Sequence, residues 1–159
     1  VRFLADEYSF DISARRAISM SCNIPAKDYA LILMLHYQLA KLKSLPPLEN
    51  EWMDFKELSG VEGYEPAFRK RVVEPVIRKY GKIPEGLIQA GEKFKAKKSD
   101  KGDIGLIIDV FGGVPALVVF WKADEEFGAE ANILFDKSIG KIFCIEDIIV
   151  MAEMIARQL

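Results

Sequence analysis

The run LIIDVFGGVPALVVFW, residues 106–121, decides the fold of this chain. It holds two segments rich in Val, Ile, Leu and aromatic residues, Leu106 to Phe111 and Ala116 to Trp121, with two glycines and a proline between them. Segments of this composition are typical of strands, and glycine and proline between them indicate a turn. The run therefore predicts a hairpin in the middle of the main sheet, and Ile133 to Phe135 predicts a further short strand.

The rest of the chain alternates between further strands and helices. An antiparallel meander is expected within residues 1–20, where Tyr8, Phe10 and Ile12 alternate with polar residues. Helices are expected from Pro25 to Leu42, from Pro66 to Tyr80 with a kink or break at Pro75, from Pro84 to Phe94, and from Ile145 to the end. The predicted fold class is α+β: one domain over 1–159 with an antiparallel sheet, further helices and a C-terminal amphipathic helix.

The segment from Pro25 to Leu42 is the most apolar of the expected helices. Leu31, Leu35, Leu39 and Leu42 follow helical spacing, and residues 32–34 are apolar as well. An apolar pattern all round a helix indicates burial on most sides. The pattern predicts the central helix of the fold.

Composition restricts the class of protein. The chain has 159 residues and a net charge of -2, which gives no bulk attraction to nucleic acid or to an anionic membrane. The lysine-rich block 93–101 has no arginine and only one aromatic residue, so we interpret it as a solvated helix end and loop. No apolar run reaches the roughly 20 residues that a membrane-spanning helix needs. With only two cysteines, far apart, a cytoplasmic protein without a nucleic-acid or membrane partner is expected.

The residue inventory leaves catalysis undetermined. Cys22, Cys144 and His36 cannot form a closed zinc or iron–sulfur site within one chain, and no nucleotide-binding glycine motif occurs. Any nucleophilic constellation would have to use His36 as its base. Because His36 lies in the most apolar helix, a buried or helix-interface imidazole is the more ordinary interpretation. No catalytic residue or cofactor is assigned.

An acidic cluster is the most unusual feature. Asp124, Glu126 and Asp136 would emerge near one edge of the sheet if their strands are neighbours. Oxygen ligands of this kind suit a hard cation such as Mg²⁺, Ca²⁺ or Mn²⁺. The competing interpretation is a solvated turn that Asp124 caps.

Two function hypotheses follow. The first is an accessory domain that binds a small molecule or a protein partner, in a pocket between the connection around Trp52 and the sheet edge that carries Asp124 and Asp136. Tyr64, His36 and Glu126 complete its candidate ligand-binding residues, although Trp52 and Tyr64 also suit core filling. The alternative is a divalent-metal-dependent hydrolase that uses Asp124, Glu126 and Asp136.

The same region carries a packing prediction. Successive strand side chains face opposite sides of a sheet, so one of Phe120 and Trp121 is expected in the core. Phe127 is expected to be buried and Glu125 exposed, with a loss of about 3 to 5 kcal/mol for Phe127→Ala.

A family resemblance appears in the ordered motifs along nearly the whole chain. These are residues 33–37 (LMLHY), 52–58 (WMDFKEL), 63–64, 102–103, 120–121, 124–127 (DEEF), 133–136 (ILFD) and 146–147. In combination they resemble the domain of unknown function 3786 family of anaerobic bacteria and archaea. The resemblance implies an anaerobe's cytosolic protein near corrinoid or one-carbon metabolism, and it implies no catalytic residues.

Overall fold

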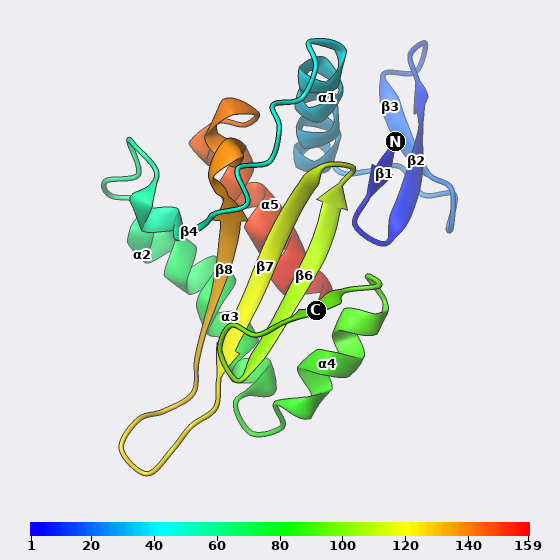
Figure 1. Ribbon diagram of the computed structural model, residues 1–159. Coiled ribbons are helices and arrows are strands. Elements are labelled where there is room, and N and C mark those ends of the chain that lie inside the picture. The colour runs from blue at the N-terminus through cyan, green and yellow to red at the C-terminus, as the bar shows by residue number, and fades with distance from the viewer.

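The computed structural model describes all residues, 1–159, and contains two antiparallel sheets. The smaller sheet has the order β1-β2-β3, and the larger has the order β4-β8-β7-β6-β5. The strands are β1 (Arg2–Phe3), β2 (Asp6–Asp11), β3 (Arg16–Ser19), β4 (Trp52–Met53), β5 (Lys97–Ser99), β6 (Ile104–Phe111), β7 (Val114–Trp121) and β8 (Glu130–Asp136). Helices and antiparallel sheets together confirm the predicted α+β class, and the meander at the N-terminus is present (Figure 1).

The predicted hairpin lies at the centre of the larger sheet. Strands β6 and β7 pair from Ile104 opposite Phe120 to Phe111 opposite Val114. The turn between them needs a positive φ at Gly113, 81°, which glycine adopts without steric cost. Most side chains of both strands are buried, so the sequence run that predicted the hairpin also supplies much of the core.

One side of β8 is only partly covered. Strand β7 pairs with β8 over six positions, from Ala116 opposite Phe135 to Trp121 opposite Glu130. On the other side, β4 pairs only with the last two residues of β8, Phe135 and Asp136. The N-terminal part of β8 therefore has no strand on its outer side.

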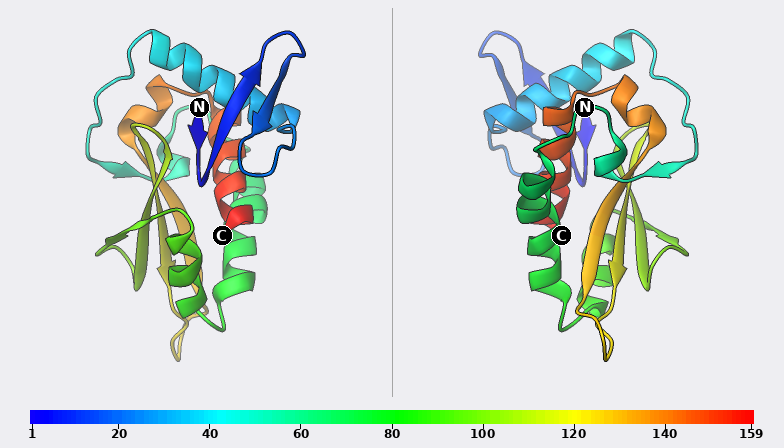
Figure 2. Two further views of the ribbon diagram at one scale, coloured as in Figure 1. Left: turned by 90° about the vertical axis from the view of Figure 1, so that its right-hand side faces the viewer. Right: turned by 90° about the vertical axis from the view of Figure 1, so that its left-hand side faces the viewer.

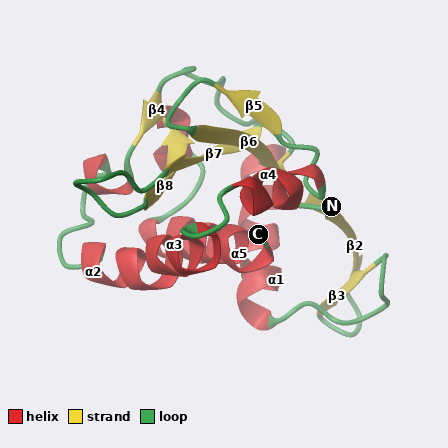
Figure 3. Ribbon diagram, turned by 90° about the horizontal axis from the view of Figure 1, so that it is seen from below, coloured by secondary structure: helices red, strands yellow, loops and turns green.

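Helices cover one face of the larger sheet and form a second layer (Figures 2 and 3). They are α1 (Asp28–Leu42), α2 (Glu65–Phe68), α3 (Glu74–Tyr80), α4 (Glu85–Glu92) and α5 (Ile145–Gln158), with 3-10 turns η1 (Phe55–Glu57) and η3 (Lys137–Lys141). Helix α5 is amphipathic, as predicted, and buries residues such as Ile148, Ala152 and Ile155 against the core.

The helix expected from Pro66 to Tyr80 is divided in the way that Pro75 suggested. Between α2 and α3 lies a π-helical segment, η2 (Arg69–Val73), and Pro75 stands at the start of α3. Proline has no N–H to donate to the preceding turn, so the helical hydrogen-bond pattern must change there. The wider π turn keeps the chain helical across this point.

Two expectations about particular segments are wrong. Most of the circumference of α1 was expected to be buried, but only Ala30, Leu33, Met34 and Tyr37 are buried in it. The reason is that α1 lies beside α5 at one end of the molecule instead of inside the helical layer (Figure 2). The lysine-rich block 93–101, expected to be helix end and loop, contains edge strand β5. No helix of the chain has the length and apolar character to cross a membrane.

Candidate functional site

A cleft of about 610 Å³ lies along the uncovered part of β8. One wall is the strand itself, with Glu130, Ala131 and Asn132, and Trp121 of β7 lies beside them. The opposite wall comes from η1, α2 and η2, through Asp54, Phe55, Lys56, Glu65, Pro66, Phe68, Arg69 and Val73. The cleft therefore occupies the position where a longer β4 would have continued the sheet.

Alternate backbone N–H groups of β8 point toward the cleft and β4, away from β7. At the C-terminal end, the Lys137 N–H donates to the Glu51 carbonyl, 3.0 Å away, in the direction of β4. The N–H groups of Ala131 and Ile133 share that direction because strand residues two apart face the same way. They donate to the side chains of the preceding residues instead: Ala131 to Glu130 Oε1 at 3.2 Å, and Ile133 to Asn132 Oδ1 at 2.8 Å. These two amides have side-chain partners where a neighbouring strand would supply carbonyls.

Two polar bridges cross the cleft from the helices to the strand. Arg69 of η2 donates twice to Glu130, at 3.3 and 3.2 Å, and this contact raises the pKa of Arg69. Asn132 Nδ2 donates to Asp54 Oδ2 at 2.8 Å. Arg69 and Glu130 are both about half exposed, so their ion pair is worth about 1 kcal/mol or less. The bridge between Arg69 and Glu130 can therefore open at low cost.

The inner part of the cleft is apolar. Phe55 and Phe68 are buried and their rings stack, with centroids 4.3 Å apart and planes inclined by 6°. The π-helical segment brings Arg69 and Val73 to the same wall. Around this apolar part, the charged residues that line the cleft are Asp54, Lys56, Glu65, Arg69 and Glu130.

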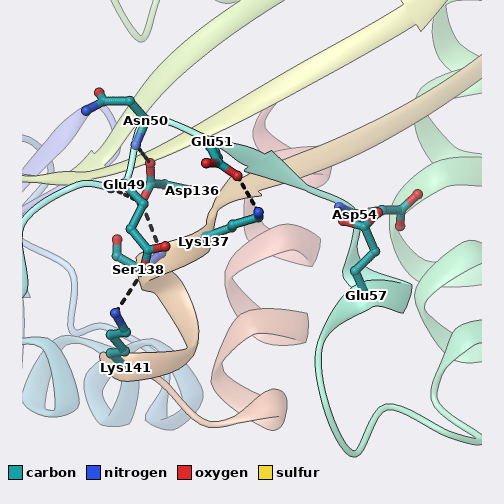
Figure 4. Close-up of polar contacts among 9 residues, drawn as sticks. All are labelled: Glu49, Asn50, Glu51, Asp54, Glu57, Asp136, Lys137, Ser138 and Lys141. Atoms are coloured by element: carbon teal, nitrogen blue, oxygen red, sulfur yellow. Dashed lines mark hydrogen bonds and ion pairs between the residues drawn. The ribbon is translucent and has the colours of Figure 1, made fainter.

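Of the predicted pocket residues, Trp52 and Asp136 pair on adjacent strands but neither lines the cleft. Asp136 is buried and accepts hydrogen bonds from the backbone N–H groups of Glu49, Asn50 and Ser138, at 3.0, 2.7 and 3.0 Å (Figure 4). Its position there holds the connection 49–51 against the start of η3. The geometry is that of a structural cap.

The predicted acidic cluster is not assembled. Asp124 follows the C-terminal end of β7 and Asp136 ends β8, and because the two strands are antiparallel these carboxylates lie at opposite ends of the sheet. Asp124 Oδ1 accepts from the N–H groups of Glu126 and Phe127, at 2.9 and 2.7 Å, which lowers the pKa of Asp124. Glu126 is exposed in the same turn. No group of three or more His, Cys, Asp or Glu residues could hold a metal ion, so the prediction of a three-carboxylate metal site is wrong.

Tyr64 and His36 reach the N-terminus of α5 from two sides. The Tyr64 hydroxyl donates to Glu146 Oε1 at 3.0 Å, and this bond raises the pKa of Tyr64. His36 Nδ1 lies 2.8 Å from Asp147 Oδ2. His36 is therefore a helix-interface residue, and its side chain is exposed on a groove of about 360 Å³ that Cys144 also lines. The sequence predicted a helix that starts at Ile145. It gave no signal that Tyr64 and His36 would contact Glu146 and Asp147 in its first turn.

The packing prediction around Trp121 was right in part. Phe120 is buried and Trp121 is exposed, as alternation requires, and Glu125 is exposed. Phe127 was expected to be buried and is 70% exposed, so that prediction is wrong. The Asx-type turn is closed by the Asp124 carboxylate, which accepts from two backbone N–H groups, and by the bond from the Asp124 N–H to the Phe127 carbonyl. It needs no buried ring, and it projects beyond the sheet (Figure 1).

Fold and cleft together define an α+β protein with a ligand-sized cleft at an open sheet edge. The chain belongs to the family described as Domain of unknown function (DUF3786), whose model matches residues 1–158. Searches among curated proteins and among solved structures found no match.

Proposed function

We propose that this protein is an accessory domain that binds a protein partner by accepting an extended segment of that partner as an added strand beside β8. The observation that carries the proposal is the pair of N–H groups, of Ala131 and Ile133, that face the cleft without a backbone partner. Addition of a strand to an open sheet edge is a recurring mode of peptide recognition, in which main-chain hydrogen bonds supply much of the affinity.

The position of β4 supports this mode. Met53 pairs with Phe135, and after it the chain turns away into η1. An added segment would continue the β4 ladder toward Glu130. Five residues of β8, 130–134, are open to it, a length of about 17 Å in extended chain. Its carbonyls would replace the Glu130 and Asn132 side-chain oxygens at the two amides.

The lining of the cleft would supply specificity. Side chains of an added strand alternate between two faces. Those on the inner face would meet the wall of Phe68 and Val73, and Arg69, Glu130 and Lys56 lie at the polar rim. A volume of about 610 Å³ would also admit a small molecule, since such sites span roughly 300–1,000 Å³. A polypeptide is favoured because the edge amides of Ala131 and Ile133 have no backbone partner.

A cytoplasmic location and the absence of a nucleic-acid partner form part of the same proposal, and the low net charge of -2 supports the latter. A role near anaerobic corrinoid or one-carbon metabolism stays a prediction from the family resemblance. No arrangement of carboxylates favours the hydrolase, and it is not proposed further.

Selection from a displayed library of random peptides on the immobilised chain tests the proposal. We expect enriched peptides to slow hydrogen exchange at the amides of Ala131 and Ile133 more than elsewhere, as read by two-dimensional NMR. Peptides that protect a different surface, or a library that yields no binder, would contradict strand addition at this edge.

Two variants with opposite expected effects separate binding from folding. Ala131→Pro removes one edge N–H, which sheets tolerate at an edge, and should weaken peptide binding at least tenfold. Asn132→Ala frees the Ile133 amide and opens the bridge to Asp54, so it should strengthen binding. Because a damaged fold does not increase affinity, a gain for Asn132→Ala cannot be attributed to unfolding. Equal affinity for both variants and the original chain would reject the proposal.

A further inference from the structure

Helix α1 carries two apolar faces, and only one of them is covered. Ala30, Leu33, Met34 and Tyr37 are buried against the core. On the other face, Ile32, Leu35, Leu39 and Leu42 are exposed by 49%, 43%, 55% and 84%. Single exposed apolar residues are ordinary, but a continuous row of this kind marks an interaction surface. We call these four residues the α1 seam.

The spacing of the α1 seam is that of a helix-pairing surface. Its members follow one another at intervals of three, four and three residues, the a and d positions of a heptad. At 1.5 Å of rise per residue the row is about 15 Å long, which is most of the helix. Beside it lies the groove of about 360 Å³ between α1 and η3, to which Leu39 belongs. An apolar row next to a hollow is the surface into which side chains of a second helix can pack.

The charges at the two ends of α1 indicate what covers the seam. Asp28 lies in the first turn, Lys41 in the last turn and Lys43 directly after it. None of the three takes part in any ion pair of the chain, and the neighbouring Lys27 lies over the ring of Tyr29, 6.0 Å from its centroid. The helix therefore presents the Asp28 carboxylate at its start, with the Lys27 ammonium turned toward Tyr29, and only positive charges at its end.

We propose that the α1 seam binds a second copy of this chain, with the two α1 helices antiparallel. In that orientation Asp28 of each copy meets Lys41 and Lys43 of the other, and the opposed helix dipoles are also favourable. A parallel pair would bring the Lys41 and Lys43 charges of the two copies together. A two-fold pair requires a self-complementary patch, and an apolar row with opposite charges at its ends satisfies this requirement.

The expected dimer is weak. A single pair of short helices buries less than the roughly 1,200–2,000 Å² of a standard interface. Dissociation in the micromolar range is therefore expected, with a monomer at high dilution. The seam lies on α1 and the cleft lies on β8, so this inference does not depend on the proposed function.

Sedimentation of the whole chain over a range of concentrations tests the proposal. We expect a shift from monomer to dimer with rising concentration. Leu35→Glu, near the middle of the pair, should leave a monomer, and its melting temperature should match that of the original chain at high dilution, since Leu35 is not in the core. The matched control is Ile83→Glu, at an apolar residue that is 68% exposed outside α1, and it should dimerise like the original chain.

Charge reversal tests the orientation. Asp28→Lys should weaken the dimer at least several-fold, and combining it with Lys41→Asp and Lys43→Asp should restore it. The proposal is overturned if the original chain is monomeric at every concentration, including the case in which the seam binds a different protein. It is also overturned if Leu35→Glu and Ile83→Glu dimerise equally well, or if the triple variant fails to recover.

Discussion

His36 on α1 and Asp147 on α5 are joined across the helix interface, with 2.8 Å between Nδ1 and Oδ2. Asp147 is buried, and the side chain of His36 beside it is partly exposed to solvent. The contact joins α1, whose outer face carries the exposed α1 seam, to α5, which packs in the core. It therefore connects the α1 seam to the main body of the protein.

Loss of this contact should cost stability. We expect His36→Ala to lower the free energy of unfolding by about 1 kcal/mol, because the Asp147 carboxylate stays buried without its partner and solvent screens part of the gain. Urea unfolding measures this. Gln38→Ala, on the same helix, is the control and should change stability by less than about 0.5 kcal/mol. Equal losses in the two variants would mean that the contact contributes nothing specific.

Asp136 should be a larger contributor. Asp136→Ala removes the acceptor of three backbone N–H groups at a buried position, and we expect a loss of about 2 kcal/mol in urea unfolding. Asp124→Ala is the matched control, since Asp124 caps an exposed turn. A loss for Asp136→Ala no larger than for Asp124→Ala would contradict a structural role.

The same carboxylate predicts a pH dependence. Burial alone would raise the pKa of Asp136, but hydrogen bonds from Ser138 and from the amides of Glu49 and Asn50 outweigh it and lower the pKa below the ordinary value of 3.8. A group with a depressed folded-state pKa stabilises the fold above its unfolded pKa, and this stability is lost as pH falls through the folded value. The stability gap between the original chain and Asp136→Asn should therefore narrow below a pH of about 4. A gap that stays constant down to pH 2, a point roughly two units below the ordinary Asp value, would show that the pKa is not coupled to folding.

The two cysteines should differ in reactivity although both are exposed. The hydrogen bond with the Ser19 hydroxyl lowers the pKa of Cys22, whereas partial burial, and then the Asp147 carboxylate, raise that of Cys144. Because the thiolate is the reacting form, iodoacetamide near neutral pH should label Cys22 first, as peptide mass spectrometry can measure. Asp147→Asn should accelerate labelling of Cys144 and leave Cys22 unchanged. Equal rates at both sites in the original chain would contradict the assigned environments.

Substitutions of Phe127 and Phe120 compare a residue of the exposed turn with a residue of the core. Phe127→Ala should cost no more than about 0.5 kcal/mol, since the ring is in solvent, while Phe120→Ala should cost about 3 to 5 kcal/mol. Chemical denaturation of both variants decides between them. A substantial loss for Phe127→Ala would mean that the ring is anchored by a contact outside this chain.

The sequence predicted those elements whose pattern is local. The hairpin at 106–121 is apolar on both faces with glycines at its turn, and the helix that ends the chain has a clear stripe, so both could be placed without tertiary information. The expectation for α1 failed for a different reason. The apolar residues of α1 could not be divided into core face and open face, because periodicity does not distinguish burial within the chain from burial against another molecule.

The candidate site was predicted less well because it depends on register. The carboxylates of Asp124 and Asp136 were expected to meet. Asp124 lies in the loop that joins β7 to β8, and Asp136 lies at the other end of β8, so the length of the strand separates them. The cleft residues Glu130 and Asn132 gave no signal, since the strand was expected to begin only at Ile133. The open edge of β8 exists because β4 ends at Met53, and only the tertiary structure shows where β4 ends.

The self-capped amides of β8 have a consequence for solubility. An uncovered strand edge is where sheets of separate molecules join and aggregate. At the other edge of the sheet, Lys97 and Lys98 of β5 place like charges that repel a second sheet. On β8, Glu130 and Asn132 keep the edge amides occupied by hydrogen bonds from their own chain. A variant such as Asn132→Ala that captures a partner more tightly should therefore also precipitate more readily on storage.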